Sequence, residues 1–214
     1  MFKIKNKEIL NRKNLMAIIA FLLVIAIGII TKFTSGGILG EENIYYILGG
    51  TNRNVILLNI AKIFAFIGSP KFLVPTIFVI FPASIYINKR LFSLGLLIST
   101  AGSFILNHTI KTIFRRPRPL DFMLMTETSY SYPSGHTMTN TCIYLFLAYY
   151  FSKDKDAKTK SLYYSIAIMI SGIMGMSRVY LGVHYISDVV GGFLAAYFFY
   201  HFSTEFLKKS KLTQ

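Results

Sequence analysis

Cysteine, tryptophan and acidic residues are scarce in this sequence. Its 214 residues include one cysteine, Cys142, and no tryptophan. A single cysteine cannot form an intrachain disulfide or a cysteine-rich metal site. The nine Asp and Glu residues are scattered and form no paired carboxylate cluster of the kind that holds Mg²⁺. The sequence therefore predicts neither a metal site nor another cofactor.

Charge is low overall and strongly one-sided. Charged residues make up 15% of the chain, hydrophobic residues make up 53%, and the mean hydropathy is +0.51. These values are too apolar for an ordinary soluble domain of this size. The net charge of +14 could indicate nucleic-acid binding, but such proteins gather their cations on a soluble face. Here most cations lie between apolar runs, so the composition favours a membrane protein and argues against a nucleic-acid partner.

Six apolar segments approach the ~20 residues that a spanning helix needs once end turns are added. We predict an all-α, polytopic membrane helix bundle with six transmembrane helices, in a single domain over residues 1–214. In segment 54–68, four isoleucines share one helical face and two polar residues share another, which predicts a helix lying in the membrane interface. Small residues, such as Gly95, Ser99 and Ser103, recur at the spacing of close helix packing. The predicted spans are 15–31, 71–87, 91–110, 137–151, 162–176 and 185–202.

The loop cations predict the orientation, because cations near the spans mark the cytoplasmic side. There are five in the N-terminal tail, two at 88–90, four at 152–160 and three in the C-terminal tail. With six spans they all lie on one side, so both termini are predicted to be cytoplasmic. A seventh span at 54–68 would separate the first five from the later nine. The basic tail and first apolar run resemble a signal peptide, but 32–35 offers no small-x-small cleavage site, so we predict an uncleaved first helix.

Three polar clusters interrupt the apolar pattern within residues 111–188. The first is Lys-x6-Arg-Pro and starts at Lys111, the second is Pro-Ser-Gly-His and ends at His136, and the third is Ser-Arg-x5-His-x3-Asp and ends at Asp188. On the predicted topology all three meet on the extracytoplasmic side. Cations there depart from the positive-inside trend, which indicates a site for an anion.

The cations and the serine of these clusters suit a phosphoryl group, whose transfer concentrates negative charge on oxygens. Lys111, Arg118 and Arg178 can neutralise that charge, the arginines with a planar fork and the lysine as a point charge. We expect Ser134 to cap a helix that begins here. Together with Gly135 it would then present backbone N–H groups to the anion.

The two histidines have different predicted settings. His184 and Asp188 are four residues apart and are expected on one face of a helix, where the carboxylate would hold one ring nitrogen and leave the other free. His136 is expected one turn into the helix that Ser134 caps, pointing at the same place. The pattern thus predicts an activated nucleophile at His184, with His136 directed at the same place.

The three motifs together resemble the signature of the type 2 phosphatidic acid phosphatase (PAP2) family, and every position of that signature is matched. The resemblance implies a membrane-embedded, metal-independent lipid phosphatase with six helices. It also implies that His184 attacks phosphorus to give a phosphohistidine, that His136 protonates the leaving oxygen and that Asp188 orients His184. The phosphate-binding residues implied by the resemblance are Lys111, Arg118, Ser134, Gly135 and Arg178.

The substrate is the least specified part of this prediction. The candidates are undecaprenyl diphosphate, phosphatidylglycerol phosphate and phosphatidic acid, and a site that faces outward favours the first. Membrane lipids are the expected surroundings, and nothing in the sequence indicates a protein partner. We expect the segment 120–132, with Glu127, Tyr130 and Tyr132, to line the entrance of the site.

Two other classes of protein compete with this interpretation. A transporter or anion channel can also line a path with Arg, Lys and His, but it would place them inside several spans instead of at one end. A relative that acts on soluble esters, or a vanadate-binding haloperoxidase, would share the motifs, although the haloperoxidase needs no six-span scaffold. Arg115 and Arg116 lie between motif positions, and we interpret them as interfacial cations that reach towards lipid headgroups. The role of His108, one turn before Lys111, stays open.

Overall fold

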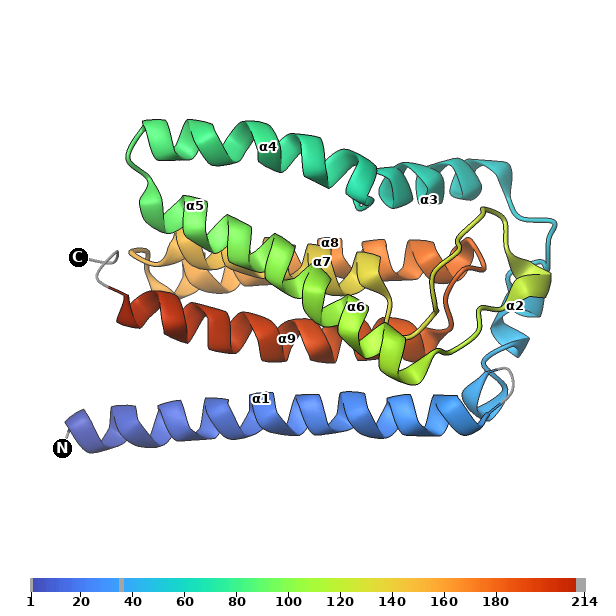
Figure 1. Ribbon diagram of the computed structural model, residues 1–214, viewed down its shortest axis with the longest axis horizontal. Helices are drawn as coiled ribbons and strands as arrows, with labels where there is room; N and C mark the ends of the chain where they lie inside the picture. Colours follow the sequence, from blue (N-terminus) through green and yellow to red (C-terminus); the bar gives the residue numbers. More distant parts are fainter. Residues whose placement is uncertain (1, 35–36, 211–214) are drawn as a thin grey trace.

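The structure is a computed structural model that describes residues 2–34 and 37–210, with side chains described from residue 12 onward. Over these ranges the chain is helical and contains no strand, as predicted. Figure 1 shows the order of the helices along the chain. They are α1 (Phe2–Phe33), α2 (Asn43–Ile47), α3 (Val55–Ile67), α4 (Pro70–Tyr86), α5 (Arg90–Leu97), α6 (Ser103–Phe114), α7 (Gly135–Ser152), α8 (Ala157–Tyr180) and α9 (Ile186–Lys209).

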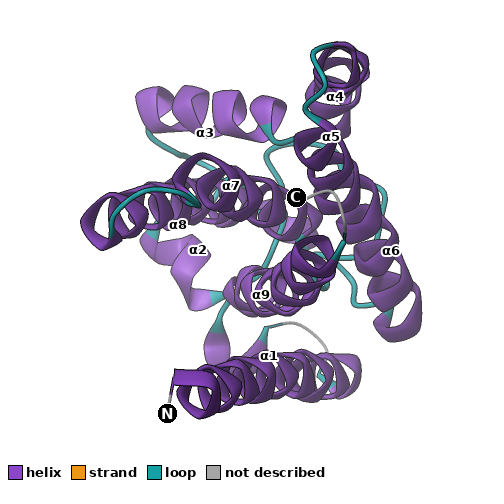
Figure 2. Cartoon of the chain, turned by 90° about the vertical axis from the view of Figure 1, so that its left-hand side faces the viewer, coloured by secondary structure: helices purple, strands orange, loops and turns teal. Residues whose placement is uncertain are grey.

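The helix α7 lies in the middle of the bundle. It contacts α5, α6, α8 and α9, and Figure 2 shows it enclosed by its neighbours while α1 packs outside against α9. Its buried residues include Thr137, Thr139, Asn140 and Thr141. A helix enclosed by protein can carry polar groups that would be costly against lipid. This position explains why α7 tolerates the polar residues at the start of its apolar run.

Several helices are long and apolar enough to cross a membrane. In the described part of the chain these are 12–33 in α1, 90–114 in α5 and α6, and 157–180 in α8. The helices α3 and α4 pass the same test only as a pair, bent by 43° at the break between them. Each of the six predicted spans is occupied by helix, so the chain is an all-helical membrane protein. Three or four helices have the apolarity of a span, and the count of six stays a prediction.

Helix boundaries differ from the prediction where local signals extend or divide an apolar run. The helix α1 starts well before residue 15, and its candidate span begins at residue 12. The α5 and α6 segments join through a π-helical stretch, 98–102. The predicted interfacial helix is α3, where the Asn54 side chain accepts from the amides of Ile56 and Leu57. Its location at the interface is still a prediction, because α3 continues into α4 through the bend.

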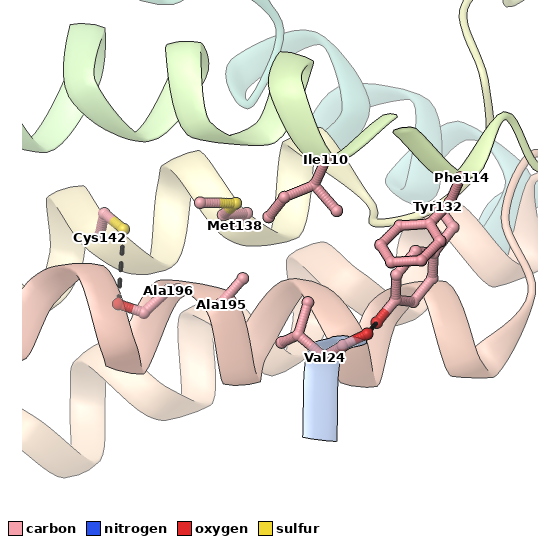
Figure 3. Close-up of a cluster of buried hydrophobic side chains, with 8 residues drawn as sticks. All are labelled: Val24, Ile110, Phe114, Tyr132, Met138, Cys142, Ala195 and Ala196. Atoms are coloured by element: carbon pink, nitrogen blue, oxygen red, sulfur yellow. Dashed lines mark hydrogen bonds between the residues drawn. The ribbon is translucent and has the colours of Figure 1, made fainter. Parts of the chain in front are cut away.

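A buried cluster joins α1, α6, α7 and α9 beneath the loop that connects α6 to α7. Figure 3 shows the Tyr132 hydroxyl pointing at Val24, to whose carbonyl it donates at 2.7 Å. The Tyr132 ring meets Phe114 edge-on, with centroids 5.7 Å apart. Tyr132 is fully buried, so the expectation that it lines the entrance is wrong: its ring belongs to the core and ties the loop to α1.

The two ends of the bundle differ in what they carry. Figure 1 shows that the start of α1 and the end of α9 lie at the same end. The end of α6, the start of α7 and the turn between α8 and α9 lie at the other. All three sequence motifs therefore meet at one end of the bundle, opposite the start of α1 and the end of α9.

Candidate active site

Two backbone features place the motif residues at this end of the bundle. The helix α6 ends at Phe114, and Arg115 then takes a left-handed conformation with φ 52°, two residues before Pro117. Gly182, in the turn between α8 and α9, has φ 68°, and a Cβ there would lie 1.8 Å from the Phe122 carbonyl oxygen. Glycine is needed because the α6–α7 loop runs directly across this turn.

His184 and Asp188 form the buried centre of the site. The distance from His184 Nδ1 to Asp188 Oδ2 is 3.2 Å, and the side chain of His184 is 2% exposed. The expectation that both lie on one helix is wrong for His184, because α9 begins at Ile186. Asp188 instead accepts from the Tyr185 amide at 2.9 Å in a capping box. This cap turns the carboxylate back towards His184, which lies before the helix. The predicted contact therefore forms through the cap and not along one helical face.

The Asp188 carboxylate has two further donors that the motifs do not include. The Ser131 hydroxyl donates to Asp188 Oδ2 and lies 3.3 Å from His184 Nδ1. Arg116 Nη1 donates to Asp188 Oδ1 at 2.6 Å. A carboxylate with donors at both oxygens is held in one orientation. Arg116 lies inside the K-x6-R-P motif, and Ser131 lies two residues before the P-S-G-H motif. This closeness in sequence was the available signal for both residues.

The second ring nitrogen of His184 faces the cations. Arg118 Nη1 lies 3.3 Å from His184 Nε2. Burial first, and then the charges of Arg118 and Lys111, hold the pKa of His184 well below its ordinary value. The ring is therefore neutral, and the hydrogen bond to Asp188 places its proton on Nδ1. The lone pair then lies on Nε2, facing Arg118, and the assignment of this nitrogen as the nucleophile stays a prediction.

The three motif cations converge near this nitrogen, and two of them share a carboxylate. Glu127 accepts from Arg178 Nη2 and lies 3.8 Å from Arg118 Nη2. Lys111 Nζ donates to the carbonyl oxygens of Tyr130 and Ser131, the second at 3.2 Å. All three cations are buried. Glu127 thus contacts two of the cations that the prediction assigns to phosphate. A bound phosphate would have to compete with Glu127 for them.

The P-S-G-H motif begins α7 as predicted. Ser134 is the N-cap residue, and its hydroxyl oxygen accepts from the Thr137 amide at 3.4 Å. A Cβ at Gly135 would lie 2.9 Å from Asn107 Oδ1. His136 is the second residue of the helix, closer to its start than the predicted full turn, and its Nε2 lies 3.1 Å from the Ala65 carbonyl oxygen.

A cavity of about 790 Å³ extends from these groups along α4, α5 and α6. Its polar end includes Gly135 and His108, and its opposite wall consists of apolar side chains from α4, α5 and α6. Arg178, Ser134 and Asp188 are not among the residues that line it. The other polar residues that line it are Thr100, Asn107, Lys111, Arg118, Glu127, Ser129, His136, Thr139 and His184.

Arg115 and Arg116 have opposite environments, although they are adjacent. Arg115 is exposed, as an interfacial cation should be. Arg116 is completely buried, so the interfacial interpretation is wrong for it. The left-handed conformation of Arg115 turns the chain, and the next side chain points inward to Asp188. Neighbouring arginines carry the same sequence signal, and only the backbone turn separates them.

Residues that could hold a metal ion are not gathered in the part of the chain that the structure describes. No group of three or more His, Cys, Asp or Glu side chains comes together within residues 2–34 and 37–210. The charges around His184 are those of Lys111, Arg118 and Arg178, and the arrangement can neutralise a bound anion with these side chains.

A family model described as the PAP2 superfamily matches residues 92–211. The chain is 38% identical to phosphatidylglycerophosphatase B of Bacillus subtilis over 59% of this chain and 64% of that protein. It is 28% identical to an undecaprenyl-diphosphatase of Sulfolobus acidocaldarius over 51% of this chain and 52% of that protein. These matches span less than two thirds of either relative.

The fold is also similar to a solved structure. That structure is the crystal structure of a transmembrane PAP2-type phosphatidylglycerolphosphate phosphatase from Bacillus subtilis. The TM-score is 0.79 and the sequences are 31% identical, with 91% of this chain and 97% of the other chain covered. The likeness therefore extends beyond the motif region to nearly the whole bundle.

Proposed function

Because the chain belongs to the PAP2 superfamily, we propose that it is a membrane phosphatase that hydrolyses a lipid phosphate through a phosphohistidine at His184. One observation carries the proposal. The cavity has a polar end with His184, Arg118 and Lys111, and an apolar wall from α4, α5 and α6. A lipid phosphate has the same two parts, an anionic headgroup and a long apolar chain. A soluble ester would leave the apolar wall unused.

The first chemical step forms a bond between nitrogen and phosphorus. The His184 Nε2 lone pair attacks phosphorus, the P–O bond to the lipid breaks, and the leaving oxygen takes a proton from His136. The proton comes from the imidazolium form of His136: its Nε2 is directed at the Ala65 carbonyl, so Nδ1–H is the donor. Burial and the charge of Arg178 lower the pKa of His136 to about 3, so the bound phosphate anion must raise this pKa for the step to occur. Asp188 holds the Nδ1–H of His184 throughout, which stabilises the positive charge that forms on the ring.

The second step regenerates the enzyme. Water attacks phosphorus, the N–P bond breaks, and the water proton returns to His136, so inorganic phosphate leaves and both histidines recover their starting states. Lys111, Arg118 and Arg178 would neutralise the equatorial oxygens in both steps. With three cations for this purpose, the mechanism needs no bound metal.

For the substrate, we favour phosphatidylglycerol phosphate. The sequence relative at 38% identity and the structural relative at 31% identity both carry this activity in their names. The undecaprenyl diphosphate favoured by the sequence prediction has the weaker support of a relative at 28% identity, and we keep it as the second candidate. We also propose that the site opens to the extracytoplasmic side.

The test is phosphate release by the detergent-purified protein in the presence of EDTA. The panel should contain phosphatidylglycerol phosphate, undecaprenyl diphosphate, phosphatidic acid and a water-soluble phosphate ester. We expect the first to have the highest kcat/KM and the soluble ester the lowest. Equal rates on the lipids and on the soluble ester would contradict the role of the apolar wall, and loss of activity with EDTA would contradict the metal-free mechanism.

A further inference from the structure

Arg116 makes a set of contacts that the proposed mechanism does not use. Its Nη1 donates to Asp188 Oδ1 at 2.6 Å and to Ser187 Oγ at 2.7 Å. Its Nη2 donates to Glu41 Oε2 at 3.1 Å, and its guanidinium stacks over the Tyr185 ring at 4.0 Å. A completely buried guanidinium with this many partners has a single orientation.

Glu41 holds the far side of the same guanidinium. It lies in the connection between α1 and α2, far from the site in sequence, and contacts the first turn of α9. Its Oε1 accepts from the Ser187 amide at 2.6 Å, and its Oε2 accepts from Ser187 Oγ at 2.9 Å. Arg116 therefore bridges two carboxylates, Glu41 on one side and Asp188 on the other, and Ser187 joins them.

We propose that Arg116, anchored by Glu41, is a positioning residue that sets the orientation of Asp188 and thereby of His184. Arg116 occupies Asp188 Oδ1, while Oδ2 is left to His184, Ser131 and the Tyr185 amide. Losing the Arg116 contact would leave a buried carboxylate without its ion pair and free to rotate. The inference rests on the proposed function, since it assigns a purpose to the geometry around the nucleophile.

The position of Arg116 separates this role from phosphate binding. The Nη atoms of Arg116 are engaged by Asp188, Ser187 and Glu41, and the Asp188 oxygen that Arg116 contacts is not the one that contacts His184. These contacts place the effect of Arg116 on the reaction at Asp188. Its loss should affect the chemical step and leave the affinity for phosphate unchanged.

The kinetic test compares Arg116→Lys with Arg115→Lys, the same substitution at the adjacent exposed arginine. Lysine keeps the buried positive charge but cannot reach Asp188, Ser187 and Glu41 together. We expect Arg116→Lys to lower kcat by about 10–100-fold, the range known for the partners that orient metal-binding side chains in the same way. The inhibition constant for inorganic phosphate should stay at the wild-type value, and Arg115→Lys should match the wild type in both. Glu41→Gln, which keeps the shape of the anchor, should lower kcat in the same direction.

Two kinetic results would overturn the inference. One is a wild-type kcat for both Arg116→Lys and Glu41→Gln. The other is a rise in the inhibition constant for inorganic phosphate in Arg116→Lys equal to that in Arg118→Lys, which would make Arg116 a phosphate ligand. If Arg116→Lys fails to fold, the kcat of Glu41→Gln alone still tests the positioning role of Arg116.

A spectroscopic test is independent of turnover. The chain has four histidines, so ¹⁵N-histidine labelling gives few ring signals, and the His184 signals are those lost in His184→Gln. We expect the Nδ1–H tautomer of His184 in the wild type and in Arg115→Lys, and a mixture of tautomers in Arg116→Lys. An unchanged tautomer in Arg116→Lys would overturn the positioning role even if the wild type hydrolysed no lipid. A wild type without activity on any substrate would instead overturn the proposed function.

Discussion

At the residue scale, His184 is restrained from three directions. Asp188 holds Nδ1, Arg118 lies against Nε2, and the Tyr45 hydroxyl donates to the His184 backbone carbonyl at 2.9 Å. A nucleophile held in this way loses little further freedom on reaching the reacting geometry. The chemistry should therefore depend on the ring of His184 far more than the fold does.

Replacement of His184 tests this directly. His184→Ala should abolish phosphate release while the protein remains folded, because the loss is the covalent step itself. The measurement is kcat in detergent, with size-exclusion elution and thermal unfolding as controls for the fold. Retention of a tenth or more of the wild-type kcat, a barrier change of about 1.4 kcal/mol or less, would show that another group forms the intermediate.

The proton-donor role of His136 predicts a dependence on the leaving group. His136→Ala should lose about 10²–10⁴-fold in kcat on a lipid alkoxide. A nitrophenyl phosphate should lose much less, because nitrophenolate departs without protonation. Both rates are measured on the same preparation, so differences in folded fraction cancel. Equal losses on the two substrates would remove His136 from the acid role.

The lowered pKa of His184 predicts the acid side of the pH profile. The nucleophile reacts unprotonated, so its activity declines as the pH falls through its pKa, and burial together with Arg118 places that pKa below the ordinary histidine value. The kcat/KM of the wild type should hold level through the usual histidine range and decline only at lower pH. Arg118→Gln removes the second cause of the shift, so its decline should begin at a higher pH. Coincident profiles would show that another group controls this limb, since substrate ionisation is common to both.

At the scale of single elements, capping and turns decided the outcomes that the sequence pattern missed. The motif spacing predicted the contact between His184 and Asp188, with both residues on one helical face. The helix instead starts at Ile186, and the cap at Tyr185 makes the contact. Arg115 and Arg116 share one sequence signal and are separated by a left-handed residue. Such features depend on local backbone geometry, which apolar periodicity does not encode.

Helix packing gives an element-scale prediction with a matched control. Gly95 in α5 faces the buried Phe146 ring of α7, and a Cβ there would lie 2.0 Å from Phe146 Cε2. A Cβ at Gly172 in α8 would have no atom of a neighbouring residue within 4 Å. Gly95→Ala should therefore destabilise by about 1–3 kcal/mol through overpacking. Gly172→Ala should be neutral or stabilising by up to about 1 kcal/mol. The temperature of half-unfolding in detergent measures both, and equal shifts would contradict close packing at Gly95.

At the scale of the whole molecule, composition and motif order predicted an all-helical membrane bundle with one polar end. The parts that could not be predicted are contacts between distant segments. Glu41 reaches Ser187 across most of the chain, and Tyr132 leaves the loop to join a core with Val24. Each is a polar group satisfied by a partner on another helix, so it appears only when the bundle is assembled.

The remaining whole-molecule question is which side of the membrane the polar end faces, and the second substrate candidate, undecaprenyl diphosphate, depends on it. Charge counting predicts that the α7–α8 turn lies in the cytoplasm and the site end outside. Thr128 in the α6–α7 loop and Lys155 in the α7–α8 turn are both exposed. The start of α7, which follows that loop, and the end of α7, which precedes that turn, lie at opposite ends of the bundle (Figure 1). In a Cys142→Ser background, Thr128→Cys should react with a membrane-impermeant maleimide on intact cells, and Lys155→Cys should react only after the membrane is opened. The reverse labelling would place hydrolysis at the inner leaflet, which would exclude an externally released diphosphate carrier as substrate and leave phosphatidylglycerol phosphate and phosphatidic acid.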